Sequence, residues 1–291
     1  MKVEKGRDVF DYVELVDEAG GSSARIAPSR GGLAYSFKVK GRESFQLDRA
    51  SFDDTTKNVR GGNPLLFPLC GPAKDNTYIA NGKSHTIKQH GFARLMPWKV
   101  VGTNAGPSAS MTMELTPDAE TRAAYPWEFT VRYTYELAGN TLKLAQEYTN
   151  KSETPMPVHA GFHPYFRVGD KNKLRLEIPA TKYEDTVAWK THDYTGTLDF
   201  SQDVIDIVFL DMKKNEASVV DEVEKVRISV KHDAAFKYVV FWTTKGNNFV
   251  CVEPWTGRRF TLNTGKDLIH VKAGETFKTW VSFSVAPLEG A

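Results

Sequence analysis

The sequence predicts an all-β protein, built as one large antiparallel β-sandwich. Short segments in which apolar and polar residues alternate follow one another along the chain, a pattern typical of strands with one buried face. Turns rich in glycine and proline separate them, and the best helical candidate, residues 118–124, is short. Strands that lack crossover helices pair antiparallel. Since no break in composition divides the 291 residues, we expect a single domain over residues 1–291.

The N-terminal part is expected to contain short strands followed by two loops. Strands and glycine turns alternate from Tyr12 to Leu47, most clearly over residues 32–41. Residues 60–72 contain so many glycines and prolines that they predict a loop of defined shape rather than a regular element. Residues 74–88 are expected to form a long loop that resembles an insertion.

Strands dominate the rest of the chain. Residues 110–115 form one candidate, and residues 129–137 and 141–148 flank an Ala-Gly-Asn turn, which predicts a long hairpin. Further strands are expected over residues 173–179, 225–231, 236–242, 249–255 and 276–285.

The composition excludes several classes of function. The chain has 38 basic and 36 acidic residues, a net charge of +2, with the two signs interspersed, so nothing indicates nucleic acid or an anionic membrane as a partner. The apolar runs are only of strand length, and the charged N-terminus lacks the apolar core of a secretory signal. Two cysteines do not make a disulfide framework, so we expect a cytoplasmic protein.

The stretch Val158–Phe166 gathers two histidines, a glycine and a proline. If it is a strand, alternation places His159, Gly161 and His163 on one face, and the glycine leaves room beside the two imidazoles. Pro164 removes a backbone donor, so the strand is expected to end there or to lie at an edge. A ligand site and a pair of core histidines are equally compatible with this stretch alone.

Four reactive side chains precede a glycine or a proline, namely Arg60, His90, His163 and Glu253. Glu253 is the most informative, because it ends the apolar run 249–252 and is followed by Pro-Trp. Partial burial against Trp255 is expected to raise its pKa toward neutrality, which suits a general base. The alternative is a structural ion pair with Arg258 or Arg259.

One carboxylate and one imidazole, accompanied by arginine and aromatic residues, indicate a site for carbohydrate. No GxSxG, P-loop, GxGxxG or HExxH motif is present, so we expect neither a metal nor another cofactor. Glycosidases generally need two carboxyl groups, and a single good candidate stands out here. This pattern favours proton transfer over glycosyl transfer.

Four motifs occur in an order and at a spacing that resemble the galactose mutarotase-like (aldose 1-epimerase) family: RGGNPLLFP, QHGFAR, HAGFHPYF and VEPWTG. The resemblance extends from about Tyr12 to Val285. It implies the family's large antiparallel β-sandwich, the supersandwich, which agrees with the strand pattern.

The resemblance also implies roles for individual residues. His163 matches the family's catalytic acid and Glu253 its catalytic base, while Arg60 and His90 match positions that contact sugar hydroxyls. Asp206 resembles the family's sugar-binding aspartate. Three neighbouring aspartates leave that match open, namely Asp199, Asp203 and Asp211. His159 has no firm counterpart, and we expect it to line or support the pocket.

The implied chemistry is acid–base opening of a cyclic sugar. Glu253 removes the proton of the anomeric hydroxyl while His163 protonates the ring oxygen, and reclosure on the other face gives the other anomer. Ordinary pKa values are roughly 4.3 for Glu and 6.5 for His. Near neutrality the carboxylate is therefore already charged, and a neighbouring carboxylate is expected to raise the pKa of the histidine.

Several alternatives remain open. We favour an aldose 1-epimerase that acts on a free hexose, as a monomer or a homodimer. A hexose-6-phosphate 1-epimerase would need a phosphate clamp, for which Arg94, Lys88 and Lys74 are candidates, although ordinary surface charge is the simpler interpretation. A non-catalytic carbohydrate-binding protein of the same fold is a further possibility. A lyase or glycoside hydrolase is disfavoured by the missing second carboxylate.

Overall fold

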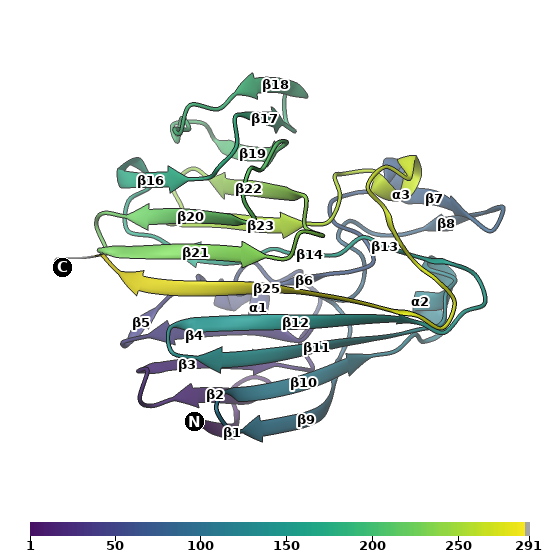
Figure 1. Ribbon diagram of the computed structural model, residues 1–291, viewed down its shortest axis with the longest axis horizontal. Helices are drawn as coiled ribbons and strands as arrows, with labels where there is room; N and C mark the ends of the chain where they lie inside the picture. Colours follow the sequence, from purple (N-terminus) through teal and green to yellow (C-terminus); the bar gives the residue numbers. More distant parts are fainter. Residues whose placement is uncertain (289–291) are drawn as a thin grey trace.

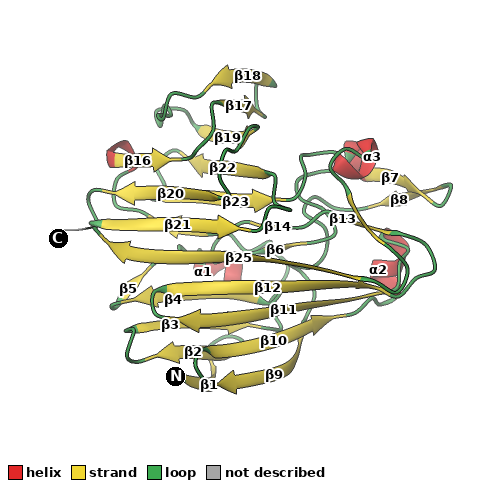
Figure 2. Ribbon diagram, viewed as in Figure 1, coloured by secondary structure: helices red, strands yellow, loops and turns green. Residues whose placement is uncertain are grey.

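Strands form nearly all of the regular structure in a computed structural model, which describes residues 1–288 (Figures 1 and 2). All pairings between named strands of these residues are antiparallel, and they build the two layers of a large sandwich. The predicted fold class is therefore confirmed. None of the helices within residues 1–288 has the length and apolar character needed to cross a membrane.

The first layer is an eight-stranded sheet that contains the predicted hairpin. Its strands in spatial order are β16 (Leu174–Glu177), β20 (Glu216–Asp221), β21 (Val226–His232), β25 (Thr276–Pro287), β12 (Thr141–Asn150), β11 (Phe129–Ala138), β10 (Ala109–Leu115) and β9 (Lys99–Ala105). Strands β11 and β12 form the hairpin, with Phe129 opposite Asn150 at one end and Ala138 opposite Thr141 at the other.

The second layer consists of two sheets that lie side by side. The N-terminal one contains β1 (Lys2–Arg7), β2 (Asp11–Asp17), β3 (Ser22–Ala27), β4 (Leu33–Val39) and β5 (Arg42–Glu43). The other contains β18 (Lys190–Asp193), β17 (Lys182–Asp185), β19 (Val204–Phe209), β22 (Tyr238–Thr244), β23 (Phe249–Trp255), β14 (Gly161–Phe162) and β6 (Leu65–Leu66), and β15 (Tyr165–Arg167) also pairs with β23. Isolated bridges such as Phe45 to Phe166 and Leu47 to Gly61 join the two sheets.

The remaining elements are short. Two further strand pairs are β7 (Thr77–Ala80) with β8 (Lys83–Thr86), and β13 (Met156–Val158) with β24 (Ile269–Val271). The helices are α1 (Arg49–Asp53), α2 (Ala119–Ala124) and α3 (Thr261–Thr264), with two 3-10 turns at Lys74–Asn76 and Lys171–Lys173. The expectation of a plain loop over residues 74–88 is wrong, because these residues form the β7–β8 hairpin, turned by Asn81 and Gly82 at positive φ.

Strand alternation gives β23 one face in the sandwich core and one face outside it. Val250 and Val252 belong to the main core between the layers, whereas Cys251, Glu253 and Trp255 point to the opposite face. Neighbouring strands follow the same rule, so Val240 and Trp242 of β22 and Asp206 and Val208 of β19 share that outer face. The outer face therefore gathers an unusual set of polar and aromatic side chains.

A break in strand pairing exposes this outer face at one point. Along one edge of β23, β15 pairs with residues 249–251 and β14 pairs with Trp255, which leaves residues 252–254 without a partner on that side. Pro254 lacks a backbone donor and is therefore tolerated in this gap. The chain between β14 and β15, which carries His163 and Pro164, crosses the same gap. Pro164 thus ends β14, in agreement with the prediction for that stretch.

Gly161 allows close packing between β14 and β23. A Cβ atom there would lie 2.7 Å from the Cys70 sulfur and 2.8 Å from the Trp255 indole. The space expected beside Gly161 is therefore filled by protein atoms. The absence of a side chain at Gly161 lets Trp255 pack against the chain that carries His163.

We predict that Gly161→Ala destabilises the protein by about 1–3 kcal/mol, because the added methyl group must displace a buried sulfur or indole. The measurement is urea unfolding followed by tryptophan fluorescence. Gly102→Ala in β9 is the matched control, since its Cβ would meet no atom within 4 Å. Equal stability of the two variants would contradict the packing role of Gly161.

Candidate active site

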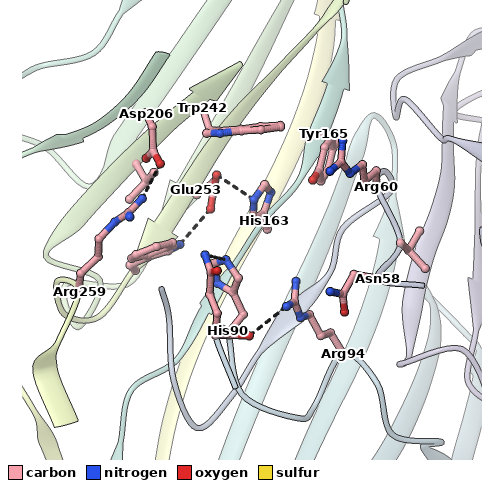
Figure 3. A pocket seen from close by; sticks show the side chains of 14 residues that line it. Asn58, Arg60, His90, Arg94, His163, Tyr165, Asp206, Trp242, Glu253 and Arg259 are labelled. Carbon is pink, nitrogen blue, oxygen red and sulfur yellow. Dashed lines mark hydrogen bonds and ion pairs between the residues drawn. The ribbon is translucent and has the colours of Figure 1, made fainter. Parts of the chain in front are cut away.

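A cavity of about 250 Å³ opens on the outer face of the β19–β22–β23 sheet (Figure 3). All five site residues named from the sequence line it: Arg60, His90, His163, Asp206 and Glu253. They come from five separate segments, so the fold brings together side chains spread over almost two hundred positions of the chain. Only the carboxylates belong to long strands, and the other three residues lie on loops or at strand ends.

His163 and Glu253 face each other at the centre of the cavity. His163 Nε2 lies 3.4 Å from Glu253 Oε1, and the Trp255 indole N–H donates to Glu253 Oε2 at 3.2 Å. The His163 ring stacks on Tyr165 with centroids 4.8 Å apart, which fixes the plane of the imidazole. The alternative of an ion pair between Glu253 and a nearby arginine is wrong, because Arg258 pairs with Glu184 and Arg259 with Asp206.

Burial opposes charge on both members of this pair. Glu253 is 1% exposed, and its burial raises the pKa of its carboxyl group well above the ordinary value, with a further rise from the Asp206 carboxylate. Burial, together with the positive charge of Arg94, lowers the pKa of His163 to about 3. The expected rise in the histidine pKa is therefore wrong, since loss of hydration outweighs the effect of the neighbouring carboxyl group.

His90 is a neutral hydrogen-bond donor toward the cavity. Its Nδ1 accepts the backbone N–H of Gly71 at 3.1 Å, so the ring proton lies on Nε2. The Gln89 side-chain amide lies 3.2 Å from that atom and accepts its proton only with the amide oxygen turned toward it. Burial and the nearby Arg94 guanidinium lower the pKa of His90 well below its ordinary value. Its backbone has a positive φ of 66°, a strained conformation of the kind found at functional sites.

His159 does not line the cavity, so it does not share a face with His163 as the alternation implied. The stretch is not one strand, because β13 ends at Val158 and β14 begins at Gly161. The His159 ring lies behind Trp255, fully buried, and its Nδ1 accepts the backbone N–H of Cys70 at 3.3 Å. His159 and His90 thus hold two successive backbone amides of the same loop.

Asp206 is the aspartate that reaches the cavity. It pairs with Arg259 at 2.6 Å through Oδ2, while its buried Oδ1 has no hydrogen-bond partner within residues 1–288. The three other candidates point elsewhere: Asp199 accepts from Ser201, Asp203 pairs with Lys245, and Asp211 accepts from Thr181. A buried carboxylate oxygen without a partner is costly, so it is suited to receive a hydroxyl group of a ligand.

Two guanidinium groups line the side of the cavity where Tyr165 lies. Arg94 donates to the carbonyl oxygen of Gln89 at 2.9 Å, and neither it nor Arg60 pairs with a carboxylate among the described residues (Figure 3). The other two candidates for a phosphate clamp, Lys74 and Lys88, are exposed and do not line this cavity. Of the three residues considered for a phosphate clamp, only Arg94 lines the cavity.

Sequence reasoning missed several residues of the cavity wall, among them Asn58, Gln89, Trp242 and Arg259. Trp242 lies directly opposite Asp206 in the β19–β22 register, and a single sequence does not show which strands pair. The sequence indicates Arg259 only as a possible ion-pair partner of Glu253. The signal that could have found it was an arginine close behind the VEPW motif.

One group of side chains has the composition of a metal site. The ligand atoms of His163, Cys251 and Glu253 lie within 4.8 Å of one another. Burial and the neighbouring Glu253 raise the pKa of the Cys251 thiol well above its ordinary value, so a metal would have to displace its proton.

The antiparallel β-sandwich and the paired carboxyl and imidazole groups agree with what the four sequence motifs imply. The sequence profile of the family described as aldose 1-epimerase matches residues 13–284, and the chain belongs to this family. The resemblance seen in the four motifs is thereby confirmed.

Individual relatives agree with this assignment. A crystal structure of a Synechocystis protein superposes with a TM-score of 0.94 at 33% identity, covering 99% of both chains. The galactose 1-epimerase of Lactobacillus acidophilus has a TM-score of 0.78 at 16% identity, over 99% of this chain and 100% of that one, which shows a shared fold. A protein of Cenchrus ciliaris named "Putative glucose-6-phosphate 1-epimerase" is 24% identical over 282 residues, 88% of this chain and 80% of that one.

Proposed function

We propose that the protein is an aldose 1-epimerase that interconverts the α and β anomers of a free hexose. The observation that carries the proposal is the buried Glu253–His163 pair, 3.4 Å apart at the centre of a cavity lined by hydrogen-bonding groups. Membership of the family supports the reaction type. We further propose that Arg60, His90 and Asp206 hold the sugar hydroxyls, because each of them lines the same cavity.

The chemistry requires one proton to leave the anomeric hydroxyl and one to reach the ring oxygen. Glu253 as carboxylate takes the first, and His163 as imidazolium supplies the second. The bond between C1 and the ring oxygen breaks, giving the open-chain aldehyde. After rotation about the C1–C2 bond, His163 takes its proton back from the C5 hydroxyl and Glu253 returns its own to the new anomeric oxygen.

Burial of the pair assists the ring-opening step. Before opening, the catalytic form is an ion pair, and after opening both side chains are neutral. The attraction between charges 3.4 Å apart favours the ion pair, whereas burial raises the pKa of Glu253 and lowers that of His163, and so favours the neutral form. The pocket therefore stabilises the neutral pair, which is the state that coexists with the aldehyde.

Glu253→Gln is predicted to lower the rate of anomer exchange by about 10²–10⁴-fold, because the amide accepts no proton. The variant should still fold and bind glucose, since an amide has the shape of the protonated acid. Polarimetry on freshly dissolved α-glucose measures the rate, and calorimetry measures binding. His163→Asn is the companion change, with the same expected loss. A wild type that binds glucose without accelerating exchange would identify a non-catalytic carbohydrate-binding protein instead.

The pH dependence of the rate provides a second test. The pair works with a single proton, and it gains another only below the His163 pKa of about 3. It loses the last proton only above the raised pKa of Glu253. We expect kcat/KM for glucose to show no inflection near roughly 6.5, the ordinary pKa of histidine. A fall centred at that value would show that burial does not govern the pair.

A second candidate function is anomer exchange of a hexose 6-phosphate. Arg60 and Arg94 favour it, because two guanidinium groups without a carboxylate partner suit a phosphate. The name of the Cenchrus ciliaris relative points the same way. The Asp206–Arg259 pair on the opposite side favours neither substrate over the other.

A comparison of glucose with glucose 6-phosphate separates these candidates. We expect the higher kcat/KM with glucose. A preference for the phosphate, together with a loss of about tenfold or more for that substrate alone in Arg94→Ala, would establish the second candidate. Lys88→Ala is the control, since this exposed lysine lies outside the cavity and should change neither rate.

A further inference from the structure

We propose that a second cavity, next to the catalytic one, holds another sugar ring joined to the hexose through its C6 oxygen. The inference rests on the proposed function and specifies its substrate class: reducing disaccharides with a 1→6 linkage. The second cavity has a volume of about 170 Å³, against about 250 Å³ for the catalytic one. The two cavities share Arg60, Tyr165 and Trp242 as walls.

The lining of the second cavity has the chemistry that recognises a neutral, hydroxyl-rich ligand. Gln46, Thr244 and Asn247 contribute amide and hydroxyl groups. Asn247 donates to Thr244 at 3.0 Å, whereas the Gln46 side chain makes no hydrogen bond within residues 1–288. One anionic and one cationic side chain, Asp48 and Arg60, balance each other in charge. A phosphate would find no excess of positive charge here.

Aromatic rings complete this lining. Trp242 stacks on Phe249 with ring centroids 5.5 Å apart and an interplanar angle of 24°, and Tyr165 packs against both. The Trp242 side chain is only half-buried, so part of an apolar surface borders the polar groups. Flat apolar surface beside convergent amide and hydroxyl groups is what a sugar ring requires, because its C–H face and its hydroxyl rim bind differently.

The orientation of the hexose in the proposed reaction determines which of its carbons faces this cavity. The anomeric hydroxyl lies at Glu253 and the ring oxygen at His163. In Figure 3, Asp206 and Arg259 lie beyond Glu253, whereas Tyr165 and Arg60 lie beyond His163. In a pyranose the ring oxygen joins C1 to C5, so with C1 toward Glu253, C5 and its C6 substituent point toward Tyr165 and Arg60. A unit attached at C6 therefore leaves the catalytic cavity toward the second one.

A third cavity of the same volume, about 170 Å³, adjoins the opposite side of the site through Arg259 and differs in character. Its charged groups are largely committed to each other, as Glu184 is to Arg258 and Asp267 is to Lys237. Substituents at C2 or C3 of the hexose would point that way. The structure thus offers a cavity with balanced charge and the free amide of Gln46 on the C6 side, and a charged, internally paired one on the C3 side.

Anomer exchange in glucose, isomaltose and nigerose tests the proposal, because the disaccharides add the same glucose unit through a 1→6 or a 1→3 linkage. Magnetisation exchange between the anomeric protons of the reducing unit gives each rate by NMR without isolating an anomer. We expect kcat/KM for isomaltose to equal or exceed that for glucose, and that for nigerose to be at least tenfold lower.

Gln46→Ala locates the effect, because it removes a side chain that lines the second cavity but not the catalytic one. The ratio of kcat/KM for isomaltose to that for glucose should fall about fivefold, as expected for one lost hydrogen bond, with the glucose rate unchanged. Lys266→Ala, in the wall of the third cavity, should leave the ratio as it is.

Isomaltose turnover more than tenfold slower than glucose turnover, or an unchanged ratio in Gln46→Ala, would overturn the proposal while leaving the proposed function intact. Failure of the wild type to accelerate exchange in glucose itself would instead overturn the proposed function.

Discussion

The site depends on a carboxyl group and an imidazole that are held against each other in a place where neither is readily charged. Glu253 is buried in the middle of a strand, and His163 meets it only because the neighbouring strand is interrupted. The two halves of that interrupted strand, β14 and β15, leave β23 unpaired over residues 252–254. Pro254 and Pro164 both lack an amide proton, so the gap leaves no donor from either of them without a partner. The geometry of the pair is thus built from a local defect in an otherwise regular sheet.

Hydrogen bonds and close packing hold the surroundings of the pair in place. The amides of Cys70 and Gly71 donate to the rings of His159 and His90, which fixes the tautomers of both histidines. Burial lowers the pKa of His159 to about 4, so it stays neutral at physiological pH and keeps its acceptor atom. Behind the site, Gly161 allows Trp255 to approach closely enough to donate to Glu253. Each of these contacts places a neutral group where a charged one would compete with the reacting pair.

The sequence allowed the fold class and five of the polar side chains of the cavity to be predicted, because both leave local signals. Alternation marks strands one at a time, and a reactive residue followed by glycine or proline marks a strand end, as at Glu253 and His163. Contacts that depend on which strands pair, and in which register, leave no such local signal in the sequence. Trp242 reaches the cavity because β22 pairs with β19 in a particular register. The prediction for His159 was wrong for the same reason. The direction of its side chain depends on whether Val158–Phe166 is one strand or several.

The pKa of His163 was expected to rise and is lowered instead, for a different reason. A carboxylate beside an imidazole raises its pKa when both are hydrated, and that expectation needs only proximity. Burial of Glu253 and of most of the His163 side chain reverses the outcome, because the loss of hydration acts on each charge separately whereas the attraction acts only on the pair. Two side chains of the cavity wall adjust this balance: Asp206 raises the pKa of Glu253, and Arg259, bound to Asp206 at 2.6 Å, lowers it. Because these two opposite charges are tied together, they act on Glu253 nearly as a dipole. In the proposed reaction, a sugar hydroxyl that engages the free oxygen of Asp206 would change this net effect, and with it the pKa of Glu253.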